Sequence, residues 1–123
     1  VLLQIAEKFW PGPLTLILPL KDSKLQTTMN LENKIAVRVP NHKCTLSLLK
    51  KCGVIVGTSA NTSGSAPLTD PKEIIKNLDA YDVLIDDGKI SNHGESTVIE
   101  IKDDFPQILR EGVISKKEIL NLF

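Results

Sequence analysis

The sequence predicts an α/β domain whose sheet contains both parallel and antiparallel strands. Helical and strand-like apolar patterns alternate along the 123 residues, as expected for helices layered on a sheet. Two late strand patterns, 96–101 and 107–110, are separated by too few residues for the crossover that parallel strands require, so they must pair antiparallel. We therefore expect one domain, spanning residues 1–123, with a mixed sheet and flanking helices.

Local patterns locate each expected element. Pro11-Gly12-Pro13 ends the first helix, and Pro40 closes a strand. Asp70-Pro71 is a strong helix start, and Ser115 with Glu118 forms a predicted capping box. Residues 21–34 are weakly patterned and are expected to form a loop. The apolar patterns place helices at residues 1–9, 45–52 and from 71 and 116, and strands at 14–18, 35–39, 54–56, 83–85, 96–101 and 107–110.

Composition narrows the function classes. Fifteen basic and fifteen acidic side chains cancel, so no global field attracts nucleic acid or an acidic membrane. No apolar run approaches the roughly 20 residues needed to span a bilayer. Cys44 and Cys52 form neither a C-x-x-C pair nor a disulfide framework. Since no signal peptide is visible, we expect a cytoplasmic protein with free thiols.

The stretch 54–64 is the most distinctive in the chain. Three β-branched residues, 54–56, predict a short buried strand, and the turn after it contains only small, amide or hydroxyl-bearing residues. Such a turn brings backbone N–H groups close to a ligand and can bind phosphate or carboxylate, particularly beyond the carboxyl end of a strand. An ordinary polar turn would give the same pattern.

Other polar groups occur within or at the ends of predicted strands: Arg38, Ser96 with Thr97, and Arg110. If those strands are neighbours, these groups and the turn at Ser59 and Asn61 would line one cleft. Two guanidinium groups would then offer bidentate partners for carboxylate or phosphate. Each group could equally be a surface charge or a turn residue.

Five motifs in this order resemble the YrdC-like family, whose best-known members are threonylcarbamoyl-AMP synthases. The resemblance runs from Phe9 to about Ile114. The motifs are Phe9-Trp10-Pro11-Gly12-Pro13-Leu14-Thr15, Ala36-Val37-Arg38-Val39-Pro40, Thr58-Ser59-Ala60-Asn61-Thr62-Ser63-Gly64, Ser96-Thr97-Val98 and Leu109-Arg110-Glu111-Gly112. The resemblance implies a YrdC-like twisted mixed sheet with flanking helices.

The resemblance also implies a nucleotidyltransferase activity. L-threonine, bicarbonate and ATP would give L-threonylcarbamoyladenylate and pyrophosphate. A partner protein would then transfer the threonylcarbamoyl group to an adenosine of tRNA, giving N6-threonylcarbamoyladenosine (t6A). Mg²⁺ would accompany ATP, held mainly by phosphate oxygens.

Residue roles follow from the same resemblance. Arg38, Ser59 and Ser96 match positions that hold L-threonine, whereas Asn61 and Arg110 match the nucleotide side. Lys34 and Thr69 also match positions near ATP, with Lys34 acting mainly through its backbone. Catalysis there is mostly positioning and electrostatic stabilisation, so no catalytic nucleophile is assigned. No metal-binding residues are assigned either, because neither histidine has ligand spacing with a cysteine or an acid.

Two departures from the family pattern matter. The K-x-R pair that contributes to the ATP and threonine site in relatives does not occur in this chain, which suggests a domain lacking its N-terminal part and a chain inactive, or nearly so, alone. Ala66 also replaces a serine that many relatives carry after the Ser-Gly turn.

Two alternatives remain open. One is the carbamoyl-adenylating YrdC-like domain of a hydrogenase-maturation carbamoyltransferase. The other is a non-catalytic module that binds tRNA or double-stranded RNA, which zero net charge disfavours. The RNA-binding hypothesis requires that the lysines at 21, 24, 34, 43, 50 and 51 cluster on one surface.

Overall fold

A computed structural model describes residues 1–62, 64–66, 68–79, 81–90 and 94–123. The chain divides into two compact units. The first contains residues 1–46 and 94–123, and the second contains residues 47–93, with the boundary inside helix α3 (Lys43–Cys52). In the described residues, no helix is long and apolar enough to cross a membrane.

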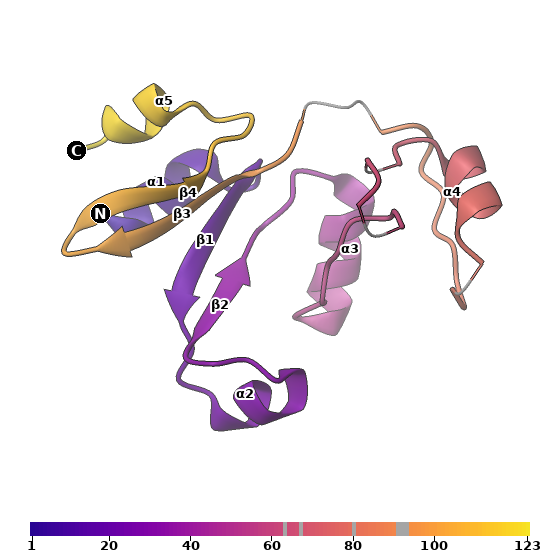
Figure 1. Ribbon diagram of the computed structural model, residues 1–123, viewed down its shortest axis with the longest axis horizontal. Coiled ribbons are helices and arrows are strands. Elements are labelled where there is room, and N and C mark those ends of the chain that lie inside the picture. The colour runs from indigo at the N-terminus through magenta and orange to yellow at the C-terminus, as the bar shows by residue number, and fades with distance from the viewer. Residues whose placement is uncertain (63, 67, 80, 91–93) are drawn as a thin grey trace. The chain divides into compact units, whose positions relative to one another are not determined.

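The first unit contains a four-stranded mixed sheet (Figure 1). Its strand order is β2-β1-β3-β4, in which β1 pairs antiparallel with β2 and parallel with β3, and β3 pairs antiparallel with β4. The mixed sheet and the antiparallel late hairpin predicted from sequence are therefore confirmed. The strands are β1 (Leu14–Pro19), β2 (Lys34–Val37), β3 (Thr97–Lys102) and β4 (Phe105–Arg110).

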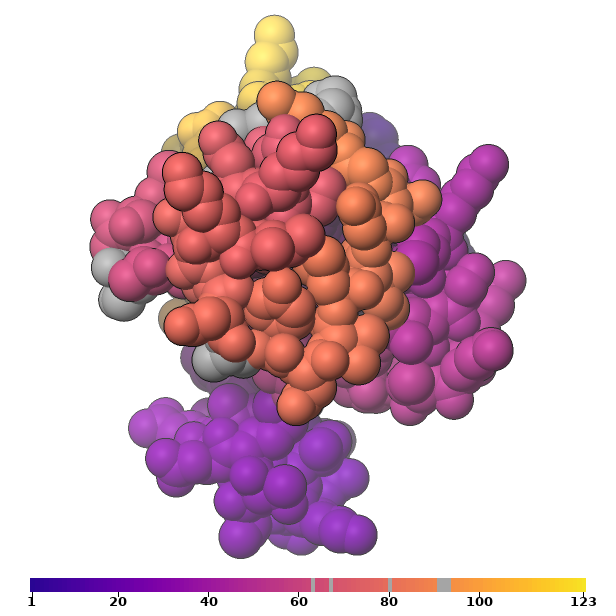
Figure 2. All heavy atoms as spheres, turned by 90° about the vertical axis from the view of Figure 1, so that its right-hand side faces the viewer, coloured from indigo at the N-terminus to yellow at the C-terminus, as the bar shows by residue number. Residues whose placement is uncertain are grey.

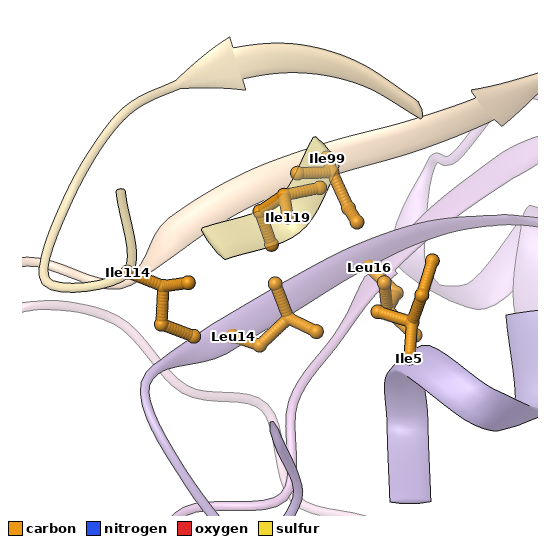
Figure 3. Packing of buried hydrophobic residues seen from close by; sticks show 6 residues of the cluster. All are labelled: Ile5, Leu14, Leu16, Ile99, Ile114 and Ile119. Carbon is orange, nitrogen blue, oxygen red and sulfur yellow. The ribbon is translucent and has the colours of Figure 1, made fainter. Parts of the chain in front are cut away.

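Two helices of this unit pack on one face of the sheet. Helix α1 (Leu2–Phe9) contributes Ile5, and α5 (Lys116–Leu120) contributes Ile119, and both are fully buried. Figure 3 shows them against apolar side chains of the central strands. Strand alternation explains this core, because every second residue of β1 and β3 points to the same face. The buried cluster consists of Ile5, Leu14, Leu16, Ile99, Ile114 and Ile119.

Helix ends follow the sequence signals. Helix α1 ends at Phe9, before the cis Trp10–Pro11 peptide bond. The Ser115 side chain accepts from the Glu118 amide, and the Glu118 carboxylate accepts from the Ser115 amide at 2.9 Å, so the predicted capping box is confirmed. Hydrogen bonds from Ser115 hold the pKa of Glu118 below its ordinary value.

The prediction of a loop over residues 21–34 was wrong in part. Helix α2 (Ser23–Met29) forms there. The Asp22 carboxylate accepts hydrogen bonds from the amides of Lys24 and Leu25, and Asn30 ends the helix in the left-handed conformation. An N-cap can stabilise a short helix that has no long apolar stripe. The hydrophobic periodicity of the sequence therefore did not predict α2.

The second unit contains the end of α3 and helix α4 (Pro71–Asn77). Helix α4 begins as predicted, with Asp70 accepting from the Lys72 amide and Pro71 in the first turn. In Figure 2, the atoms of residues 68–79 and 81–90, red to orange, lie against one another in one compact mass.

Strands predicted at 54–56 and 83–85 do not form. Val54, Val56 and Val83 are 78%, 71% and 76% exposed, and neither segment has strand geometry. Both predictions were wrong, because the strand propensity of β-branched side chains is realised only where a neighbouring strand supplies hydrogen bonds and packing. No described residue between 47 and 93 belongs to the sheet.

An ionic cluster on the sheet gives the fold a pH-dependent component. The Lys34 ammonium lies 2.5 Å from Glu100 Oε1, and the Lys102 ammonium lies 3.6 Å from Glu100 Oε2. The hydrogen bond from Lys34, followed by the charges of both lysines, lowers the pKa of Glu100 against an opposing effect of burial.

We expect Glu100→Gln to weaken the acid dependence of stability. Because the pKa of Glu100 is lower in the folded state, its contribution is present above the unfolded value of about 4.3 and is lost as pH falls through the folded value. Urea unfolding between pH 7 and pH 3 should show a smaller loss in the variant, and Lys34→Gln should act in the same direction. Wild-type acid dependence in both variants would contradict the assignment.

Candidate functional site

The sheet topology brings the chain's two arginines to the same end of the sheet. Strands β1 and β3 begin at this end, whereas β2 and β4 finish there, since Leu16 pairs with Val37, Leu14 with Thr97 and Val98 with Arg110. Arg38 follows the last residue of β2, and Arg110 is the last residue of β4. No other arginine occurs in the sequence.

Polar side chains at this end lie on the face opposite the apolar core. Thr15 alternates with the buried Leu14 and Leu16 and therefore points to the other face. Its hydroxyl lies 2.8 Å from the hydroxyl of Ser96, which precedes β3 and is only 7% exposed. Neighbouring strands thus present a pair of hydroxyls on one surface.

Arg110 is fixed against Ser96 by several bonds. Its Nε and Nη2 donate to the Ser96 carbonyl oxygen at 3.2 and 2.9 Å, and Nη2 also donates to Ser96 Oγ at 3.2 Å. Its Nη1 lies 3.2 Å from a carboxylate oxygen of Glu95. These bonds orient the guanidinium beside the Ser96 hydroxyl.

Arg38 lies at the opposite edge of the sheet from Arg110, because β2 and β4 are the two edge strands. The Pro-Gly-Pro turn holds it there. Its Nε donates to the Gly12 carbonyl at 3.0 Å, and the Gly12 amide donates to the Val39 carbonyl at 2.8 Å. Gly12 permits this packing because a Cβ there would lie 2.3 Å from the Phe9 carbonyl oxygen. Among residues that the structure describes, the two terminal nitrogens of Arg38 have no partner.

The two arginines interact electrostatically. Partial burial, and secondly the positive charge of Arg110, lower the pKa of Arg38 from its ordinary value. Arginine stays protonated at neutral pH, so two like charges are held near each other at a cost in free energy. A bound anion would relieve this repulsion, which is typical of sites that bind carboxylate or phosphate.

Thr97 and Gly112 hold the framework of this site. The buried Thr97 hydroxyl donates to the Ile114 carbonyl at 2.6 Å and accepts from the amides of Gly112 and Ile114 at 3.0 and 3.1 Å. Gly112 packs so closely that a Cβ would lie 2.2 Å from the Glu95 carbonyl oxygen. This contact joins the segment after Arg110 to the segment that carries Ser96.

Three other predicted site residues, Ser59, Asn61 and Thr69, belong to the second unit. The Asn61 amide nitrogen donates to the carbonyls of Thr62 and Ser65 at 3.0 and 2.8 Å, so this side chain braces its own turn. Its Oδ1 is buried without a partner among the described residues. Ser59 is exposed, and the Thr69 carbonyl accepts from the Ile90 amide at 2.9 Å.

A small pocket of about 80 Å³ opens beside this turn, within the second unit. Its lining includes Asn61 and Ala66 from the turn and Asn77 from α4. Ala66, where the family resemblance leads us to expect a serine, is therefore one of the residues that line this pocket. Ser63, which the sequence motif includes, lies outside the described residues.

The side chain of Lys34 is engaged elsewhere on the sheet. It begins β2, opposite Pro19, whereas Arg38 follows the other end of the same strand. Its ammonium is paired with Glu100. This is compatible with a role for the Lys34 backbone and removes one lysine from the set that an RNA-binding face would need.

Sequence reasoning missed several members of the site. Thr15, Gly12 and Glu95 contact the predicted residues, yet none was singled out for a role. Thr15 is a polar residue inside the apolar run 14–18, and that departure was the available signal. In the structure, Thr15 is partly buried and lies between the fully buried Leu14 and Leu16.

Comparisons with known proteins agree with the fold and with the family that the sequence resembles. The Sua5/YciO/YrdC family model, described as "Telomere recombination", matches residues 1–112. A threonylcarbamoyl-AMP synthase of Bacillus subtilis is 40% identical over 119 residues, covering 94% of this chain and 34% of the relative. One from Pyrococcus abyssi is 33% identical over 117 residues, with the same coverage of each.

A solved structure is similar as well. The crystal structure of P. abyssi Sua5 complexed with L-threonine matches with a TM-score of 0.86 and 32% identity, covering 98% of this chain and 36% of that one. The chain thus spans about a third of the length of these relatives. With a family model matched over nearly its whole length, this chain belongs to the Sua5/YciO/YrdC family.

Proposed function

We propose that this chain contributes the threonine-binding and part of the nucleotide-binding surface of an L-threonylcarbamoyladenylate synthase. The observation that carries the proposal is the pair of arginines held at one end of the sheet, on either side of Ser96 and Thr15. Relatives named threonylcarbamoyl-AMP synthase and a relative bound to L-threonine support the choice of substrate.

In this proposal, Arg38 binds the carboxylate of L-threonine. Its terminal nitrogens are available for a bidentate bond, while its Nε anchors the group to the Gly12 carbonyl. Ser96, whose hydroxyl is nearly buried between Thr15 and Arg110, donates a hydrogen bond to the same ligand. A planar fork suits a carboxylate better than a lysine ammonium would.

Arg110 acts on the nucleotide side. Attack of a carbamate oxygen on the α-phosphate of ATP concentrates negative charge, and a preorganised cation lowers the free energy of that arrangement. Bonds to Ser96 and Glu95 fix the Arg110 guanidinium before ATP arrives. From the family resemblance alone, Asn61, Thr69 and the Lys34 backbone are also assigned to ATP binding.

Magnesium enters with ATP in this account. In the part of the chain that the structure describes, no three His, Cys, Asp or Glu side chains come together as a metal site. Mg²⁺ retains water and binds phosphate oxygens readily, so ATP itself would carry it. Bicarbonate supplies the carbamate carbon, and a partner protein transfers the threonylcarbamoyl group to tRNA.

The test uses the full-length gene product with ATP, Mg²⁺, bicarbonate and L-threonine. We expect pyrophosphate release that depends on L-threonine, and heat of L-threonine binding in calorimetry. Omitting threonine should abolish release, and L-serine serves as the matched control for the side-chain methyl. ATP-dependent pyrophosphate release with carbamoyl phosphate and no threonine binding would instead favour the carbamoyl-adenylating alternative. RNA binding with a steep salt dependence and no ATP binding would favour the RNA module.

A further inference from the structure

We propose that Thr15 is a positioning residue that aims the Ser96 hydroxyl at the anion bound by Arg38. The inference rests on the proposed function for the identity of that anion, a carboxylate. It assigns Thr15 a role through Ser96, without contact to the reacting atoms.

The donors and acceptors around the Ser96 hydroxyl support this positioning role for Thr15. A serine hydroxyl donates one hydrogen bond and accepts two. Arg110 Nη2 can only donate, so Ser96 Oγ accepts at 3.2 Å. Its contact with Thr15 Oγ1, at 2.8 Å, can run in either direction. If Thr15 donates, both acceptor sites of Ser96 are filled and its proton is left for a ligand oxygen.

The burial of Ser96 makes the direction of its hydroxyl proton important for ligand binding. Ser96 is 7% exposed, so bulk water does little to satisfy its proton, and a carboxylate in the site is the natural acceptor. Thr15 lies on the neighbouring parallel strand, and its register opposite Val98 is fixed by the central pairing of the sheet. A rigid strand therefore fixes the donor that orients Ser96, which is how precise sites are supported.

Local sequence explains why Thr15 can do this. It is β-branched, so the strand restricts its χ1 and holds the hydroxyl in place. Valine has nearly the same shape and lacks the hydroxyl, whereas serine keeps the hydroxyl and loses the methyl. These two substitutions separate the hydrogen bond from the packing of the side chain.

The first measurement uses L-threonine binding and steady-state kinetics of the full-length gene product. Thr15→Val should raise both the Kd and the KM for L-threonine about 3- to 10-fold, the effect of one hydrogen bond, while the KM for ATP stays within about twofold. Thr15→Ser should restore wild-type values. Thr27→Val, which removes a hydroxyl bonded to the Ser23 carbonyl on exposed α2, is the matched control and should change nothing.

The second measurement asks whether Thr15 acts through Ser96. In a Ser96→Ala background, Thr15→Val should cause no further loss of L-threonine affinity, because contacting residues of one network are not additive. A further loss as large as in the wild-type background would mean that Thr15 acts independently, and would overturn the inference. Wild-type threonine affinity in Thr15→Val would overturn it as well.

A ligand-free readout separates this inference from the proposed function. The Nη2–H signal of Arg110, the group that donates to Ser96 Oγ, should shift in an NMR spectrum of Thr15→Val and return in Thr15→Ser; its loss in Arg110→Lys assigns it. If that holds and the wild-type protein binds no L-threonine, the proposed function fails while the positioning of Ser96 stands. An Arg110 signal unchanged by Thr15→Val would refute the positioning role whatever the protein binds.

Discussion

Gly112→Ala is expected to destabilise the first unit by about 3 kcal/mol or more, because backbone clashes cannot relax as core side chains do. An added Cβ would lie 2.2 Å from the Glu95 carbonyl oxygen, 2.7 Å from the Ser96 carbonyl carbon and 2.8 Å from the Thr97 nitrogen. Relief requires moving the turn after β4 away from β3, which also strains the bonds that Thr97 makes to Gly112 and Ile114. Urea unfolding followed by circular dichroism measures the loss.

Gly57→Ala is the matched control for this substitution. Neither glycine has a positive φ, and a Cβ at Gly57 would meet no atom within 4 Å. Stability should therefore change by less than about 1 kcal/mol. Equal effects of the two substitutions would show that the close approach of Gly112 to β3 does not hold the framework together.

Replacing the two arginines singly should separate the two ligands of the proposed reaction. Arg38→Ala should weaken L-threonine binding about tenfold or more and ATP binding less, since one charge-assisted bond contributes about 1.5–3 kcal/mol. Arg110→Ala should show the reverse order. Isothermal titration of each ligand into the full-length gene product, with folding checked by circular dichroism, provides both affinities.

Two controls sharpen that comparison. Arg38→Lys keeps the charge but loses the planar fork, so its L-threonine affinity should fall between wild type and Arg38→Ala. Lys24→Ala removes a positive charge from exposed α2 and should leave both affinities unchanged. Equal loss of both ligands in each arginine variant would contradict the division of roles.

The sequence predicted best those parts of the fold whose hydrogen bonds join residues close in sequence. Caps at Asp70 and Ser115 and the late hairpin involve residues close in sequence, and all three formed as expected. The strand pattern at 14–18 also formed, and the pattern at 35–39 formed as far as Val37, because each has a neighbour in the sheet. Residues 54–56 and 83–85 show the limit, since their strand character depends on partners that this sheet does not supply.

The candidate site was predictable in its charged members and not in its supporting ones. Arg38 and Arg110 stood out because charge within or at the end of an apolar strand demands an explanation. Their convergence depends on strand order, which periodicity does not reveal. Thr15 and Gly112 were harder still, because their roles come from a contact across β1 and β3 and from a missing Cβ at one close approach.

The most direct test of the account is a crystal structure of the full-length gene product with L-threonine and a non-hydrolysable ATP analogue. We predict the threonine carboxylate on the terminal nitrogens of Arg38, the Ser96 hydroxyl within hydrogen-bonding distance of it, and the nucleotide phosphates on the Arg110 side. Both ligands bound away from this end of the sheet, with neither guanidinium in contact, would contradict the account.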